Sequence, residues 1–470
     1  MDTKALRQKI LDLAIHGKLV PQDPNDEPAS VLLERIRAEK ERLIKEGKIK
    51  KGKKSAKTSD KPHYPFELPK GWVWTTIEDV CSKIGSGSTP KGSNYSKEGI
   101  PFFRSQNVYN SGIVMSDIKY ISDEIHQMMI GTEVVANDLL LNITGGSLGR
   151  CAVIPSNFEK GNVSQHVCIL RPIVIKPEFL HCFILSSFFA KSMKITGSGR
   201  EGLPKYNLEK MLLPLPPEQE QERIVAETKR LQSFVDELET SCENMTKLVA
   251  QVKSKVLDLA IHGKLVPQDP NDEPASELLK RINPKAEIIT DNGHYQKLPV
   301  GWTICRLKDI SKIVTGSTPS KSNRGYYGGI FPFFKPADLD AGRHVYKATE
   351  CLSEDGKKVS RVVPKGATAI CCIGTIGKVG YLMYEGATNQ QINCAIPSKV
   401  VDSVFLFYLC ASPLFNDKLN SESSAVTISI VNKSKIEAIS VPLPPLAEQK
   451  RIVSKIEEIF AQLEAIETAL

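Results

Sequence analysis

Two segments of the chain carry apolar residues at alternating spacings of four and three, a pattern typical of helices that pack along a seam. The seam positions are Ile224, Thr228, Leu231, Val235, Leu238, Cys242, Met245, Val249, Val252, Val256 and Leu259, and then Ile452, Ile456, Ile459, Leu463, Ile466 and Leu470. A repeat sustained this long predicts coiled-coil helices. The first, over residues 218–262, would extend about 65 Å at a rise of 1.5 Å per residue.

The first residues of the chain repeat part of the same seam, since Leu6, Ile10 and Leu13 align with Val252, Val256 and Leu259. The sequence therefore begins halfway along one long helix and ends halfway along another. We expect two antiparallel rods, one covalent and one assembled from both ends of the chain. The repeat is then cyclic, with an approximate two-fold axis.

A stretch of twenty residues, LDLAIHGKLVPQDPNDEPAS, occurs twice letter for letter, at Leu11–Ser30 and at Leu257–Ser276. In each copy an apolar helical turn reaches a glycine suited to a left-handed cap (Gly17 in the first copy). Two prolines then prevent further helix until Pro-Ala-Ser begins another. We interpret the stretch as a helix–corner–helix joint, in which the histidine (His16) fits packing better than metal ligation.

Two globular units separate these helical parts. Short β-branched and aromatic runs punctuated by Gly, Asn and Ser predict strands and loops in most of each unit. Matched phrases indicate that the units are homologous: LPKGW with LPVGW, KIGSGSTPK with KIVTGSTPS, IPFFRSQNV with FPFFKPADL, LGR with IGK, VSQHV with TNQQI, and PLPPEQEQERIV with PLPPLAEQKRIV. Late in each unit we expect one apolar helix, over residues 179–193 and 403–419.

These patterns predict an α+β fold with two homologous, strongly diverged globular domains separated by two long antiparallel coiled-coil helices. The predicted boundaries are 1–61 for the N-terminal half-rod, joint and basic linker, 62–216 for the first globular domain, 217–291 for the central helix and joint, 292–444 for the second globular domain, and 445–470 for the C-terminal half-rod.

Composition and charge add little to this picture outside one segment. The net charge is +8, and eight lysines from Lys45 to Lys61, set against Glu46 and Asp60, supply +6 of it. Such a run either steers toward phosphates or is a solvated linker. Eleven cysteines without a CxxC pair argue against a disulfide framework and a zinc site. With no signal peptide and no run of eighteen apolar residues, we expect a cytoplasmic protein.

The motifs of common catalytic sites are absent. We find no GxxxxGK(S/T) phosphate loop, no HExxH pair, no Gly-x-Ser-x-Gly turn and no Asn/Asp-Pro-Pro-aromatic motif of an amino-methyltransferase. GSGREG at Gly197–Gly202 satisfies GxGxxG, but Leu203 and Pro204 follow it instead of a helix, which favours a plain loop. We therefore expect no catalytic residue, cofactor or metal in this chain.

Polar residues at matched positions of the two units suit contact with DNA. The Gly-Ser-Thr loops offer hydroxyls and backbone N–H groups suited to phosphate, and Arg, Gln and Asn side chains make bidentate base contacts. The candidates are Ser86, Gly87, Ser88, Thr89, Lys91, Arg104, Gln106, Asn107, Arg150 and Gln165 in the first unit, and Thr315, Gly316, Ser317, Thr318, Lys321, Lys335, Asp338, Lys378 and Gln390 in the second. Strand-connecting turns and ordinary loop polarity are the alternative explanation of the same residues.

With these features the chain resembles, over essentially its full length, the specificity subunits of type I restriction–modification systems. The resemblance rests on the duplicated joint, the LPxGW and GSTP openings, PLPPxxEQxRIV and the cyclic split of the rods. These features are specific in combination, and none of them is specific alone. The resemblance implies two target-recognition domains, each reading one half of an interrupted, asymmetric site in double-stranded DNA. It also implies helices that fix the gap between the halves and dock two modification subunits, which methylate adenine.

The same resemblance places the cofactors on partner subunits: S-adenosylmethionine on the modification subunits, and ATP and Mg²⁺ with the restriction subunits that join them. It implies no membrane. Rod packing and partner docking would then fall to the seam residues Leu6, Ile10, Leu13, Leu231, Val235, Leu238, Val249, Val252, Val256, Leu259, Ile452, Ile456, Ile459, Leu463 and Ile466.

Two other functions remain open at this point. One is a protein-only coiled-coil scaffold with two protein-binding domains, which the net charge of only +2 outside the lysine run (8 − 6) favours. DNA binding that falls steeply with salt and saturates on one sequence would separate it from a DNA reader. The other is a self-sufficient methyltransferase or nuclease. The missing motifs argue against it, and S-adenosylmethionine binding by the isolated chain would support it.

Overall fold

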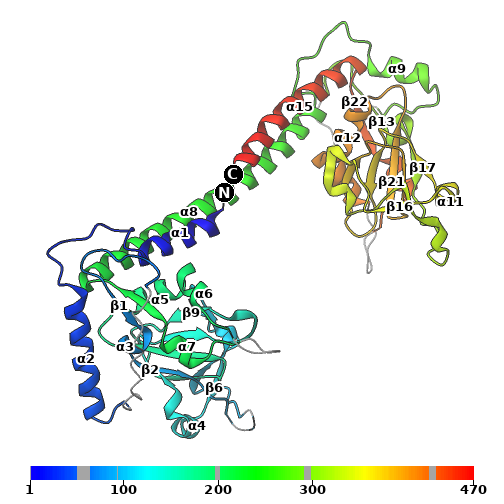
Figure 1. The fold of residues 1–470 in the computed structure, drawn as a ribbon. Helices are drawn as coiled ribbons and strands as arrows, with labels where there is room; N and C mark the ends of the chain where they lie inside the picture. The colour runs from blue at the N-terminus through cyan, green and yellow to red at the C-terminus, as the bar shows by residue number, and fades with distance from the viewer. Residues whose placement is uncertain are drawn as a thin grey trace. The chain divides into compact units, whose positions relative to one another are not determined.

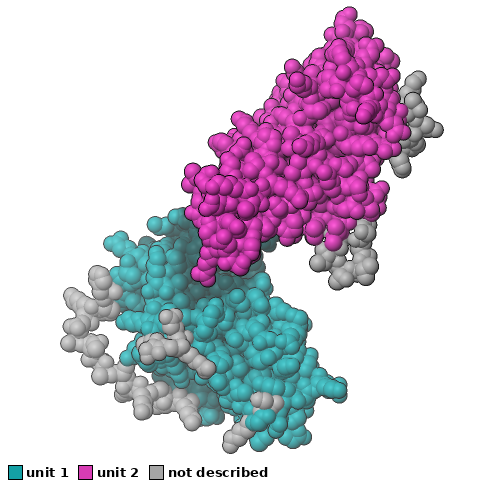
Figure 2. Space-filling view, turned by 90° about the vertical axis from the view of Figure 1, so that its right-hand side faces the viewer, with its two compact units in different colours: residues 1–241 teal, residues 242–470 magenta. Residues whose placement is uncertain are grey.

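The computed structural model describes residues 2–49, 64–90, 92, 94–195, 202–289, 298–422 and 430–470. The chain divides into two compact units, residues 1–241 and 242–470 (Figure 2). The candidate Lys91, most of the lysine-rich segment and residues 197–201 of the GSGREG loop lie outside the described residues.

The first unit opens with the joint that the duplicated stretch predicts. Helix α1 (Thr3–Ile15) ends at His16, and Gly17 follows with φ +63°. A Cβ at Gly17 would lie 2.3 Å from Cγ of Pro69, so both the backbone conformation and the packing require glycine there. Helix α2 (Ala29–Lys45) begins directly after Pro28. The cap and the restart of the helix are confirmed.

The globular part of the first unit contains two four-stranded sheets, in the orders β6-β3-β10-β7 and β2-β11-β8-β9. Only β3 and β10 pair parallel within them. A two-stranded sheet joins β1 to β12, and a short hairpin joins β4 to β5. The strands are β1 (Val73–Thr76), β2 (Cys81–Ser86), β3 (Ile100–Phe103), β4 (Val108–Tyr109), β5 (Gly112–Ile113), β6 (Lys119–Ile121), β7 (Glu133–Val134), β8 (Leu139–Asn142), β9 (Cys151–Val153), β10 (Gly161–Val163), β11 (Val167–Pro172) and β12 (Leu212–Leu215).

Short helices and turns complete this unit: α3 (Ile77–Val80), η2 (Ser105–Asn107), α4 (Asp123–Met128), η3 (Ile130–Thr132), η4 (Gly145–Ser147), α5 (Pro177–Ile184), α6 (Ser187–Ser192) and α7 (Lys205–Glu209). The single apolar helix expected over residues 179–193 is wrong, because α5 ends at Leu185 and α6 starts anew. The Ser186 hydroxyl accepts a hydrogen bond from the Phe189 N–H and so caps the second helix.

The second unit repeats the two four-stranded sheets and the two-stranded sheet, with the orders β16-β15-β20-β17, β14-β21-β18-β19 and β13-β22, while the β4-β5 hairpin has no counterpart among its described residues. Its elements are α9 (Ala275–Ile282), β13 (Thr303–Arg306), α10 (Leu307–Ile310), β14 (Ser311–Thr315), η5 (Arg324–Tyr326), β15 (Tyr327–Phe334), η6 (Asp338–His344), β16 (Glu350–Leu352), α11 (Glu354–Lys358), β17 (Val362–Val363), β18 (Thr368–Cys371), β19 (Val379–Tyr381), β20 (Gly386–Thr388), β21 (Ile392–Pro397), α12 (Ser403–Ala411), α13 (Pro413–Ser421), α14 (Lys433–Ala438) and β22 (Ser440–Leu443). Here too the expected single helix, residues 403–419, is two helices, with Ser412 as the cap of α13.

The matched sequence segments occupy equivalent positions in the strand register of the two units. Phe103 is opposite Val163 in the first unit, and Phe334 is opposite Thr388 in the second, so the Phe-Phe pairs and the following loops occupy the same places. The units therefore share one α+β fold despite their divergence.

Helices lie where the seam pattern predicts them. Helix α8 (Glu218–Ile261) is one continuous helix of 44 residues, and α15 (Leu446–Ala469) has 24. Within the first unit α1 runs antiparallel to the start of α8, because Arg7 bonds Asp236 while Gln22, beyond α1, bonds Glu220 (Figure 1). Within the second unit, Lys253 of α8 likewise contacts Glu467 of α15 at 2.7 Å. Coiled-coil packing and two-fold symmetry stay predictions.

Candidate nucleic-acid interface

The Gly-Ser-Thr loop of the first unit closes against the loop between β10 and β11. The N–H of Gly87 donates to the Val167 carbonyl at 3.0 Å, and the N–H of Ser88 donates to the Val163 carbonyl at 3.1 Å. A Cβ at Gly87 would lie 1.9 Å from the Val163 oxygen, so this approach admits only glycine. These two N–H groups are occupied within the protein, which corrects the expectation that they face phosphate.

The second unit builds the same contact from different residues. Gly316 donates to Ile392 and Ser317 to Thr388, each at 2.9 Å, and a Cβ at Gly316 would lie 2.1 Å from the Asn389 oxygen. The same correction applies to its N–H groups. The Ser317 hydroxyl also accepts a bond from the Arg361 N–H at 3.3 Å, so Arg361, which the sequence pattern did not indicate, contacts this loop from the residue before β17.

The loops that carry the other candidates meet at the same place. Ser164 donates its N–H to the carbonyl of Phe103 at 2.9 Å, which joins the Gln165 loop to the residues after the Phe-Phe pair. The Asn142 side chain donates to the Ser105 carbonyl at 2.8 Å, and its backbone N–H donates to the Arg150 carbonyl at 2.8 Å. We call these joined loops, with their counterparts in the second unit, the recognition edges.

Arg104 and Gln106 converge on one acceptor that the sequence analysis did not select. Arg104 Nη2 donates to the Asp117 carbonyl at 2.7 Å, and Gln106 Nε2 donates to Asp117 Oδ2 at 2.7 Å. Asp117 has φ +57°, a conformation uncommon outside glycine, and its side chain is 65% exposed. The cluster, in which Gln106 and Asp117 are exposed and Arg104 is half-buried, can offer both donors and a carboxylate acceptor to base edges.

Asn107 and Asp338 are buried, at 0% and 8% exposure, and hold turns. Asn107 Oδ1 accepts from the Arg104 N–H at 3.1 Å, and Asp338 Oδ2 accepts from the Lys335 N–H at 2.7 Å. Asp338 Oδ1 also accepts from the Thr349 N–H at 2.9 Å. Their polar atoms are used inside the protein, which argues against DNA contact through these two side chains.

The remaining cationic candidates have different partners in the two units. The Arg150 guanidinium lies over the exposed Tyr109 ring, 4.8 Å from its centroid. Lys378, at the matched position, contacts Asp340 at 2.6 Å, and Lys335 contacts Glu350 at 2.7 Å.

Among the polar candidates, the Thr315 hydroxyl donates to Asn393 Oδ1 at 2.6 Å. Ser86, Ser88 and Lys321 are exposed.

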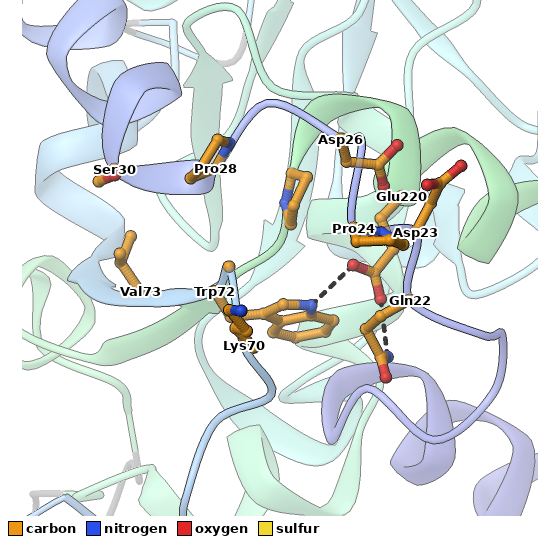
Figure 3. Close-up of a pocket in the computed structure, with 12 residues that line it drawn as sticks. Gln22, Asp23, Pro24, Asp26, Pro28, Ser30, Lys70, Trp72, Val73 and Glu220 are labelled. Carbon is orange, nitrogen blue, oxygen red and sulfur yellow. Dashed lines mark hydrogen bonds between the residues drawn. The ribbon is translucent and has the colours of Figure 1, made fainter.

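A second duplicated site lies at each joint. In the first unit Trp72 Nε1 donates to Glu220 Oε2 at 2.9 Å, and Gln22 Nε2 donates to Glu220 Oε1 at 3.1 Å (Figure 3). These residues line a cavity of about 450 Å³ beside Pro24 and Pro28. Burial raises the pKa of the Glu220 carboxyl, although both hydrogen bonds oppose the shift.

The second joint repeats these bonds with Trp302, Gln268 and Glu448, at 3.0 and 3.2 Å, and burial raises the pKa of Glu448 as well. The Trp and Glu are not among the residues that the sequence predicts as a site, although both stand in the matched segments LPxGW and PLPPxxEQ.

Metal-ligand chemistry has no counterpart in the described part of the chain, where no group of three or more His, Cys, Asp or Glu side chains could hold an ion. Among the same residues, no helix is long and apolar enough to span a membrane.

Comparison with known proteins identifies the family. The model of the type I restriction modification DNA specificity domain matches twice, over residues 69–245 and 299–470. The chain belongs to the family of type I restriction–modification specificity subunits. The EcoAI specificity subunit of Escherichia coli is 30% identical, with 97% of this chain and 89% of the relative aligned, and the EcoEI specificity subunit of Escherichia coli is 28% identical, with 99% and 90% aligned.

Solved structures agree on the fold of this specificity subunit. The HsdS subunit from Thermoanaerobacter tengcongensis superposes with a TM-score of 0.55 at 20% identity, over 86% of this chain and 93% of that one. A chain from work on complex assembly and conformational transition of the type I R-M system gives 0.57 at 22% identity, over 86% and 94%.

Proposed function

We propose that the two globular domains each read one half of a bipartite, asymmetric DNA target, and that the complex formed with two modification subunits methylates adenine within it. The carrying observation is that two recognition edges with the same backbone hydrogen bonds present different side chains. One edge has an arginine and a glutamine gathered on Asp117, and the other has Lys335 beside Glu350. A guanidinium fork and an ammonium point charge select different base edges, as an asymmetric target requires.

The identical joints fit two copies of one partner. Packing accounts for the buried residues of the duplicated stretch, but residues exposed in both copies are also identical, among them Asp23 with Asp269 and Asn25 with Asn271. A shared external surface accounts for that identity, because diverged recognition domains still have to present the same face to the same protein. We assign this face, together with the exposed seam residues Leu6, Val252 and Ile466, to the two modification subunits, and the buried seam residues to rod packing.

Helix α8 would fix the gap between the half-sites, as a coiled-coil ruler paired antiparallel with α1 and α15. One continuous helix of 44 residues resists bending far better than a flexible linker, so the domains it joins would hold a fixed separation. S-adenosylmethionine would bind the modification subunits, and ATP and Mg²⁺ would act with the restriction subunits. We expect the assembly to work in the cytoplasm, where its DNA substrate is found.

The test is adenine methylation across the genome, in cells with and without this chain. We expect methylation of one two-part motif with a fixed gap to disappear when the chain is removed and to return when it is restored. In parallel, affinity of the assembled complex for a duplex with that motif should fall steeply as salt rises. Two results together would instead identify a protein-only scaffold: unchanged methylation, and binding of this chain to partner proteins that does not weaken as salt rises.

A further inference from the structure

Each recognition edge presents one glutamine that a threonine of the neighbouring loop holds in place. The Thr89 hydroxyl donates to Gln165 Oε1 at 2.8 Å, and the Thr318 hydroxyl donates to Gln390 Oε1. All four residues are exposed. The two pairs are the same in residue type, in atoms and in place on the fold.

The loop framework beneath each pair is also the same. Gly87 and Gly316 let the threonine loop approach the glutamine loop more closely than any other residue would, and two backbone bonds lock the loops together in each unit. The threonine hydroxyl is therefore delivered to the glutamine by a rigid contact. An exposed hydrogen bond adds little to stability, since water can replace it, so stability alone does not explain why both units keep it.

Around the pair, the two edges have diverged. Ser164 and His166 flank Gln165, whereas Asn389 and Gln391 flank Gln390. At the adjoining turns arginine is replaced by lysine and glutamine by alanine, at positions 104 and 335 and at positions 106 and 337. The Thr–Gln pair thus stays constant while the residues that flank the glutamine and those that follow the Phe-Phe pair differ, which indicates a task common to both half-sites.

The chemistry of the pair narrows that task. Because the hydroxyl donates to Oε1, the NH₂ group of each glutamine is turned away from the threonine and offers two N–H donors to an oxygen acceptor. A contact that is the same in both halves cannot discriminate bases that differ between them. Phosphate oxygens, in contrast, are present at every position of any sequence, and contacts to them fix register and orientation.

We propose that Gln165 and Gln390 each donate to a phosphate oxygen at the equivalent position of the two half-sites, and so set the register in which the diverged side chains meet the bases. Thr89 and Thr318 are positioning residues that orient these amides. The inference rests on the proposed function, because it assumes that the recognition edges face DNA.

The test uses the complete complex of this chain with its modification subunits and the motif found by methylation mapping. Gln165→Glu keeps the size of the side chain but replaces its donors with an anion, and Thr89→Val keeps the shape but removes the hydroxyl. Gln127→Glu adds the same charge at an exposed position of α4, outside the recognition edge, and serves as the matched control. Affinity is measured on the motif duplex and on duplexes with one base pair changed at each position.

We expect Gln165→Glu to lower affinity about 10-fold and by the same factor on every duplex, because a phosphate contact carries no sequence information. Thr89→Val should lower affinity about 3-fold. The double variant Gln165→Glu with Gln390→Glu should lower it about 100-fold, because the effects of two distant, independent sites multiply. Gln127→Glu should leave it unchanged. A single methylphosphonate at the contacted position removes the charge of that phosphate. It should lower the affinity of the wild-type complex, but it should not further lower the affinity of the Gln165→Ala complex, which has already lost the contact.

A loss confined to one base pair would overturn the proposal in favour of base readout. Unchanged affinity in both glutamine variants, with motif preference intact, would overturn it while leaving the proposed function standing. A wild-type complex without motif preference would overturn the proposed function itself, and the proposal with it.

Discussion

The joints and the recognition edges are both duplicated in this chain, but they differ in what the duplication has kept. At the joints the side-chain bonds repeat, with Trp–Glu distances of 2.9 and 3.0 Å from identical residue types. At the edges the backbone bonds repeat, Gly87 at 3.0 Å and Gly316 at 2.9 Å, while most exposed side chains differ. The two joints thus keep the same side chains, as expected if the same partner docks at both. The two edges keep the same backbone arrangement with different side chains, as expected if each reads a different DNA sequence.

The strongest test of the edge geometry is Gly87→Ala or Gly316→Ala. The new Cβ would lie 1.9 Å or 2.1 Å from a backbone carbonyl oxygen, which cannot swing aside as a side chain can. We expect each change to lower the free energy of unfolding by about 3 kcal/mol, the upper range for an overpacked site, in urea unfolding.

Gly85→Ala in β2 is the matched control, because a Cβ there meets nothing within 4 Å. It should leave stability nearly unchanged. Equal effects at positions 85 and 87 would show that the close loop contact does not determine the edge.

At the joints, Trp72→Phe and Trp302→Phe remove the same hydrogen bond from the same kind of buried carboxylate. Leaving such a group short of a partner costs about 2 kcal/mol, and we expect equal losses in the two variants by urea unfolding. Trp74→Phe, at a ring that stacks on Tyr64 with centroids 5.6 Å apart and does not contact Glu220, is the control in the first unit. Clearly unequal losses at positions 72 and 302 would break the equivalence of the joints.

These contrasts also explain how much could be predicted from the sequence. Local signals worked well: α8 ends within one residue of its expected limit, and Gly17 takes the left-handed cap. Internal comparison of the repeats gave the matched loops. Periodicity did not reveal that Ser186 and Ser412 start new helices, because a serine cap inside an apolar run does not interrupt the apolar pattern.

Contacts between distant segments were the other limit. Asp117 accepts a hydrogen bond from Arg104 only because β6 pairs with β3, and nothing in the local sequence predicts this contact. Glu220 receives the Trp72 indole from 148 residues away. For Asn107 and Asp338, residue type suggested base contact, but burial assigned both to turn structure.

Divergence at the edges predicts that half-site specificity is separable. Arg104→Lys replaces a planar fork by a point charge and should relax discrimination at one base pair of one half-site about 10-fold, or about 1.4 kcal/mol. Lys335→Arg should alter only the other half. Affinity of the complex for singly substituted duplexes measures both. A change in both halves from either variant would contradict independent reading.

The smallest expected effect is a pH dependence that the two joints share. Burial raises the pKa of Glu220 and Glu448 above the ordinary value of 4.5. A carboxyl with a raised pKa binds its proton more tightly in the folded state, so its stabilising contribution is complete below the unfolded value and is lost as pH rises through the folded value. Unfolding free energy should therefore contain a component that declines as pH rises from 4.5.

Glu220→Gln and Glu448→Gln should each remove half of that decline, measured as the slope of urea-unfolding free energy against pH. Glu227→Gln gives the opposite sign, because hydrogen bonding to Arg230 lowers the pKa of Glu227 and its contribution is lost as pH falls. Identical slopes from the two joint variants would extend the equivalence from bond lengths to energetics. Different slopes would mean that residues of the diverged domains change the pKa of Glu220 and of Glu448 by different amounts.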